Sequence, residues 1–92
     1  MEIVLTEIEK LIDDNRLDEA LLQLENIGEP NNLIVHVCLL KGRIYQKQQR
    51  LGDAINEYSK VLEVDPENSL AKTGIEMAHS ILEFFHPDMY NP

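Results

Sequence analysis

Apolar residues in this 92-residue chain recur with the period of an α-helix, and one helix face occurs twice. In residues 16–27, RLDEALLQLENI, apolar side chains are spaced three and four residues apart, which places them on one side of a helix. The pattern returns in residues 50–61, RLGDAINEYSKV, where Arg50 and Ala54 follow Arg16 and Ala20 at one constant interval. The two stretches are therefore predicted to be equivalent helices.

Signals for the ends of these two helices agree with the apolar pattern. Asp18 and Glu19 lie in the first turn of the earlier helix, where carboxylates favour the positive end of the helix dipole. Gly28 follows as a candidate left-handed cap. The later helix is expected to end at Asp65, because Pro66 disfavours a helical conformation in the residue before it.

Three further helices are predicted around this repeated pair. An apolar stripe precedes each copy, formed by Val4, Ile8 and Leu11 and, at the same interval, by Cys38, Gly42 and Tyr45. The stripe of the fifth helix, over residues 67–85, consists of Ala71, Ile75, Ala78, Leu82 and Phe85. Residues 86–92, HPDMYNP, contain two prolines and are not expected to continue it. The predicted unit is a helix, a turn and a second helix. This unit occurs twice and is followed by one more helix.

A helical hairpin that recurs at this interval resembles the tetratricopeptide repeat family, whose unit is about 34 residues long. The second unit has the residues that this family favours at five marked positions, namely Gly42, Tyr45, Ala54, Tyr58 and Pro66. It departs from the family at Cys38, where tryptophan is preferred, and at Lys41, where leucine is preferred. The first unit keeps Ala20 and has Leu24 in place of the aromatic residue.

The resemblance implies an all-α fold of five helices, in which antiparallel helical hairpins stack into a right-handed superhelix. We expect one domain over residues 1–86, with a first unit at 1–32, a second at 33–68, a capping helix at 67–85 and a tail at 86–92. The capping helix has Lys72, Glu76 and His79 at the positions that would pack against a following helix. Because these residues are polar, the array is predicted to end there.

In this family the first helices of successive units line a concave face that binds protein or peptide segments. By register, this face would comprise Leu5, Glu9, Ile12, His36, Leu39, Arg43, Lys47, Leu70, Met77 and Ile81. The resemblance therefore implies a non-enzymatic protein-protein interaction module, such as an adaptor or scaffold. Two alternatives for the same face are a homodimer interface and coverage by the chain's own tail, which contains Met89 and Tyr90.

The charge distribution narrows the choice of partners. The net charge is −9, and residues 1–32 have nine acids against two bases, so nucleic acid would be repelled from most of the surface. Stacking of the first helices should bring Glu9 and Asp13 near Arg43 and Lys47, giving ion pairs between units. No membrane-spanning segment is expected, and an acidic start of the chain argues against a secretory signal, so a cytoplasmic location is predicted.

Motifs for catalysis, cofactors and metals are missing from the sequence. The three histidines, His36, His79 and His86, have no spacing typical of a zinc site. Cys38 is expected to be a small core residue, since its one near histidine, His36, points away from it on a helix. No glycine-rich phosphate loop and no combination of nucleophile and base occurs. The sequence predicts a protein that is not an enzyme and uses no cofactor or metal.

Overall fold

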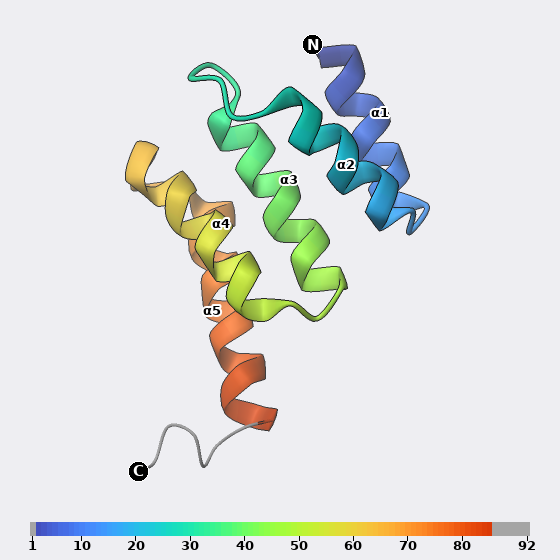
Figure 1. Ribbon diagram of the computed structural model, residues 1–92. Coiled ribbons are helices and arrows are strands. Elements are labelled where there is room, and N and C mark those ends of the chain that lie inside the picture. Colours follow the sequence, from blue (N-terminus) through green and yellow to red (C-terminus); the bar gives the residue numbers. More distant parts are fainter. Residues whose placement is uncertain (1, 86–92) are drawn as a thin grey trace.

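The computed structural model describes residues 2–85, which form five α-helices joined by short turns (Figure 1). The helices are α1 (Glu2–Asp13), α2 (Leu17–Ile27), α3 (Ile34–Lys47), α4 (Leu51–Val64) and α5 (Ser69–Phe85). Helix α3 packs against α4, and α4 packs against α5, while α1 pairs with α2, and α2 meets α3. No strand occurs among the described residues, so the predicted all-α hairpin architecture is confirmed.

The repeat period of the sequence is also present in the backbone. Helices α2 and α4 begin at Leu17 and Leu51, as predicted, and the turn before each contains a residue with positive φ, 64° at Asn15 and 62° at Gln49. The amide nitrogens of the arginines that follow these residues each donate to a carbonyl oxygen of the preceding helix, at 2.8 Å. The two turns therefore share a positive-φ residue and the same backbone hydrogen bond.

The two hairpins differ in how their helices are packed. In the second hairpin, Gly42 of α3 and Ala54 of α4 are buried and small, so the two backbones can approach closely. The residue that corresponds to Gly42 in the first hairpin is Ile8, whose side chain is fully buried and holds α1 and α2 further apart. The same repeat position thus produces a close helix pair in one unit and a wider one in the other.

Tyr58 of α4 is enclosed between α3 and α5. Its ring lies between two glycines, because a Cβ added to Gly42 would come within 2.6 Å of Tyr58 Cε1, and one added to Gly74 within 2.5 Å of Tyr58 Cε2. Its hydroxyl group donates to Gln46 Oε1 at 2.6 Å. The two glycines therefore form a slot for the ring, which connects α3, α4 and α5 through one side chain.

Helix α3 contributes to both groups of buried residues. The first core cluster consists of Leu5, Ile8, Ile12, Ala20, Leu24, Val37, Leu40 and Ile44, and the second of Cys38, Ala54, Tyr58, Val61 and Ala71. Cys38 is fully buried, which confirms its prediction as a core residue. Because α3 supplies side chains to both clusters, its orientation relative to α1 and α5 is set by packing on two sides.

Two helix ends differ in detail from the prediction. Gly28 has the expected positive φ of 73°, but its ψ of −154° lies outside the left-handed helical region. Helix α5 begins at Ser69 and not at residue 67, because the side chain of Asn68 accepts a hydrogen bond from the amide of Ala71 at 3.0 Å and acts as an N-cap. Within residues 2–85, the helices are too short or too polar to cross a lipid bilayer.

Candidate functional site

A groove runs between α3 and α5 on the side of the molecule where α1 also contributes residues. Its first hollow has a volume of about 460 Å³. The lining residues are Glu9, His36, Leu39, Leu40, Arg43, Gln46, Tyr58, Leu70, Thr73, Gly74 and Met77. Side chains or backbone of α1, α3, α4 and α5 therefore surround one concavity, whose volume falls within the range of about 300–1,000 Å³ that is usual for ligand sites.

A second hollow of about 320 Å³ continues the groove toward the turn between α3 and α4. It is lined by Arg43, Gln46, Lys47, Leu51, Met77 and Ile81. Arg43, Gln46 and Met77 belong to both hollows, so the two form one continuous groove. Both hollows lie along α5, whose apolar residues Leu70, Met77 and Ile81 form one wall over its length.

The α5 wall of the groove is apolar and exposed. Leu70 is 67% exposed and Met77 is 53% exposed, although both are large apolar side chains. The floor contains the ring of Tyr58, whose pKa is raised by burial, with a smaller opposing effect from the nearby Arg43 charge. The phenol therefore stays protonated and keeps donating to Gln46, which fixes the shape of the floor.

Charged residues line the edge of the groove that α1 and α3 form. Arg43 Nη2 contacts Asp13 Oδ1 at 2.7 Å, as the stacking of the first helices predicted. Glu9 contacts His36 Nε2 at 3.3 Å and has no ion pair with Arg43 or Lys47. Within residues 2–85, Lys47 has no ion-pair partner. The edge therefore presents one uncompensated ammonium group beside the second hollow.

The structure places eight of the ten expected concave-face residues around the groove and two elsewhere. Leu5 and Ile12 are 3% and 0% exposed and lie in the first core cluster, so they do not line it. Their helix, α1, turns these side chains toward α2 and α3 and presents the polar Glu9 instead. The remaining eight residues line the first or the second hollow.

Six lining residues are not among these ten, namely Leu40, Gln46, Leu51, Tyr58, Thr73 and Gly74. The glycine carried a usable signal in the sequence. Glycine within a helix costs about 1 kcal/mol relative to alanine, so its presence inside an otherwise regular apolar pattern usually has a packing reason. Here that reason is the ring of Tyr58, which projects from the preceding helix, α4.

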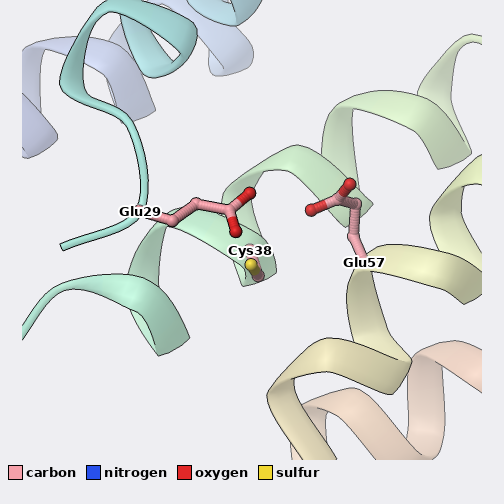
Figure 2. A group of neighbouring side chains, drawn as sticks. All are labelled: Glu29, Cys38 and Glu57. Carbon is pink, nitrogen blue, oxygen red and sulfur yellow. The ribbon is translucent and has the colours of Figure 1, made fainter. Parts of the chain in front are cut away.

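A second cluster of polar side chains lies away from the groove, around the buried thiol of Cys38 (Figure 2). Glu29 approaches it from the segment between α2 and α3, and Glu57 approaches from α4 on the opposite side. One ligand atom of each residue lies within 4.8 Å of the other two. The donor set of one sulfur and two carboxylates would suit a zinc ion in principle.

Two lysines already neutralise these carboxylates. Lys60 Nζ contacts Glu29 at 3.1 Å and Glu57 at 3.5 Å, and Lys41 Nζ contacts Glu29 at 3.5 Å. The hydrogen bond from Lys60 lowers the pKa of Glu29, whereas burial and the two carboxylates raise the pKa of Cys38 to about 12. The ion pairs of this cluster connect the α2–α3 segment to α3 and α4.

The chain matches no protein-family model, no curated protein and no solved structure.

Proposed function

We propose that this chain is a non-enzymatic protein-interaction module of the tetratricopeptide type, which binds a peptide or protein segment in the groove between α3 and α5. The single observation that supports it most is the exposed apolar wall of the groove. Leu70 and Met77 are each more than half exposed and face a concavity instead of the core. Large apolar side chains gathered in a concave surface commonly mark a contact site.

The repeat supports the assignment to this type of module. Its period appears in the apolar pattern, in the starts of α2 and α4 and in the matching turns at Asn15 and Gln49. Gly42, Ala54 and Tyr58 make the packing contacts expected of residues at the marked positions of the repeat. Binding is favoured over catalysis because the described residues that line the groove include no nucleophile beside a base.

In the proposed mode of binding, apolar side chains of the partner occupy the first hollow. Leu39, Leu70 and Met77 contact them there and contribute most of the affinity. Arg43 is paired with Asp13 at 2.7 Å, which favours a position of its guanidinium group at the rim. A hydrogen-bond acceptor of the partner can then be positioned by Arg43 without a new conformational cost.

A co-precipitation experiment tests this proposal. Three chains serve as baits in an extract of the cell from which the protein comes: the wild type, the variant with Leu70→Lys and Met77→Lys, and the control Leu22→Lys. Leu22 is 59% exposed on α2 and lines neither hollow, so the control matches the chemical change. A partner retained by wild type and control but lost by the folded groove variant supports the proposal. Retention by the folded groove variant contradicts it.

One observation favours homodimerisation as a second candidate. Leu70, Met77 and Phe84 are exposed and recur every seven residues along α5, which is the spacing of a helix-helix seam. A dimer through this stripe would make thermal stability depend on protein concentration. A monomeric mass at all concentrations tested would eliminate this candidate and leave the partner groove.

A further inference from the structure

We propose that Glu29, Cys38 and Glu57 form a binding site for one divalent metal ion of the zinc class. The thiol sulfur and one oxygen of each carboxylate lie within 4.8 Å of one another. Cysteine sulfur and carboxylate oxygen are both ligands that zinc takes in proteins. None of these three residues lines either hollow of the groove, so the site is separate from the proposed partner site.

One oxygen atom of Glu57 lacks a partner in the part of the chain that the structure describes. Glu57 is 9% exposed, and its Oε1 is buried and accepts no hydrogen bond from residues 2–85. Its other oxygen, Oε2, contacts Lys60 Nζ at 3.5 Å. Because buried polar atoms in folded proteins almost always have a partner, Oε1 indicates a ligand that completes this cluster.

The three side chains converge from separate elements of the chain. Glu29 comes from the segment before α3 and Glu57 from α4, and their carboxylate groups point toward each other beside the thiol of Cys38 (Figure 2). Zinc bonds of about 2.3 Å to sulfur and about 2.0–2.2 Å to oxygen put tetrahedral ligand atoms about 3.4–3.6 Å apart. The ligand atoms must therefore approach one another by at most about 1.4 Å, which rotations of the two carboxylate side chains can supply.

Lys60 is the group that a metal ion displaces from this cluster. Its Nζ contacts Glu29 Oε2 at 3.1 Å as well as Glu57, and its side chain is 42% exposed. The ammonium group can therefore move into water when an ion binds between the two carboxylates. Lys41 Nζ contacts Glu29 at 3.5 Å from the other helix, so its charge together with that of the ion balances the thiolate and both carboxylates.

Binding of the ion includes the loss of one proton from Cys38. The S–H bond breaks, a metal–sulfur bond forms, and the proton passes to buffer in the solvent, with no change in oxidation state. The other two bonds form from the carboxylate oxygens of Glu29 and Glu57. Three protein ligands leave the fourth tetrahedral position to a water molecule.

This site differs from the metal-free protein expected from the sequence. That expectation was based on histidine spacing and on local motifs, whereas these ligands come from one connecting segment and two helices. An ion bound to them would join the end of the first repeat unit to both helices of the second unit.

Titration of the reduced full chain with Co²⁺ tests the proposal, because cobalt bound to a thiolate absorbs in the near ultraviolet. Cys38 is the one cysteine of the chain, so this absorption reports on Cys38 alone. We expect one Co²⁺ per chain and loss of the absorption when Zn²⁺ is added, since thiolate ligands favour zinc. If no such absorption develops, the proposal is wrong.

Substitutions assign the ligands, with circular dichroism to show that each variant is folded. Cys38→Ala should abolish the absorption, and Glu57→Gln should weaken the binding of Co²⁺ at least about tenfold. Glu63→Gln is the matched control, because Glu63 is an exposed carboxylate on the same helix, and it should leave the Kd unchanged. Equal affinity of the Glu57→Gln and Glu63→Gln chains would overturn the proposal.

Lys60→Gln gives the opposite result if the proposal holds. It removes the cation that competes for both carboxylates, so Co²⁺ should bind at least about twofold more tightly. Loss of structure would not produce this gain, so the test remains decisive even if Glu57→Gln does not fold. Unchanged or weaker binding by Lys60→Gln would contradict a site between Glu29 and Glu57. Failure of the co-precipitation experiment would leave these results unaffected.

Discussion

Replacing Gly74 by alanine tests the most specific packing feature of the fold, the slot that holds the ring of Tyr58. The new Cβ would lie 2.5 Å from Tyr58 Cε2, 2.7 Å from Cζ and 2.8 Å from Cδ2. Carbon atoms in proteins pack at about 3.5–4.0 Å, so the ring or α5 must move by about 1 Å. The opposite edge of the ring faces the backbone at Gly42, and its hydroxyl group is bound to Gln46, which limits retreat.

Two opposing effects set the size of the change in stability. Overpacking of a well-filled core costs about 1–3 kcal/mol, whereas alanine within a helix is better than glycine by about 1 kcal/mol. The first effect should dominate, because three ring atoms are too close to the new methyl group. We therefore expect Gly74→Ala to lower the free energy of unfolding by about 1–2 kcal/mol, which lowers Tm by about 4–16 °C in a domain of this size.

Urea denaturation followed by circular dichroism at the helix band measures this change. Gly52→Ala is the matched control, because a Cβ there meets no atom within 4 Å and should leave stability equal or raise it by up to about 1 kcal/mol. In a Tyr58→Leu background, which lacks the two closest ring atoms, Gly74→Ala should lose most of its cost. If Gly74→Ala in the wild-type background is as stable as the wild type or more stable, the ring of Tyr58 is not packed tightly between Gly42 and Gly74.

Three further predictions follow from the ion-pair network and from the backbone. The pKa of Glu29 is lower in the folded state than its ordinary value of 4.5, so the ionised carboxylate stabilises the fold above that pH, and this stabilisation is lost as the pH falls through the folded-state pKa. The difference in the free energy of unfolding between wild type and Glu29→Gln should therefore be constant from about pH 7 to 5 and become smaller below about pH 5. A pH-independent difference would contradict the pairing with Lys60. Cys38, with a pKa of about 12, should resist alkylation by iodoacetamide at pH 8 in the folded chain and react only when the chain unfolds. Mass spectrometry measures this labelling, and rapid labelling of the native state would contradict the burial of the thiol. Gly28→Ala should lower the free energy of unfolding by about 1–3 kcal/mol, because a φ of 73° with a ψ of −154° is accessible almost only to glycine. An unchanged midpoint of urea denaturation would contradict that backbone conformation.

Much of the fold could be predicted because local patterns and packing agree. The start of α2 at Leu17 and of α4 at Leu51 followed from apolar spacing alone. Burial of Cys38 followed from its place on the apolar stripe of α3. The exposed positions of Lys72 and Glu76 also match the expected polar face of the last helix.

The groove was harder to predict, because it depends on which way each helix is rotated. Leu5 and Ile12 share the register of groove residues, but the wider first hairpin turns them into the core. Ile8, at the position where the second hairpin has glycine, lies in the same core cluster as Leu5 and Ile12. A periodic pattern identifies an apolar face, but it does not specify how far each helix is rotated about its axis.

The roles of Tyr58 and Gly74 depend on contacts between helices that no local pattern reports. Sequence reasoning assigned Tyr58 to the space beside Gly42, and the structure adds Gly74 on the other edge of the ring. The ring also lines the first hollow, together with Leu70 and Met77. Tyr58 therefore belongs both to the second core cluster and to the lining of the groove.

The affinity of a captured partner for Met77→Lys, relative to wild type and to Leu22→Lys, tests the central claim most directly. Met77 lies in both hollows and is 53% exposed, so its replacement should leave the fold intact and place a charge in the apolar wall. Titration calorimetry should show a Kd at least about tenfold weaker for Met77→Lys, a loss of about 1.4 kcal/mol, and an unchanged Kd for Leu22→Lys. Equal affinity of all three chains would show that the partner does not bind in this groove.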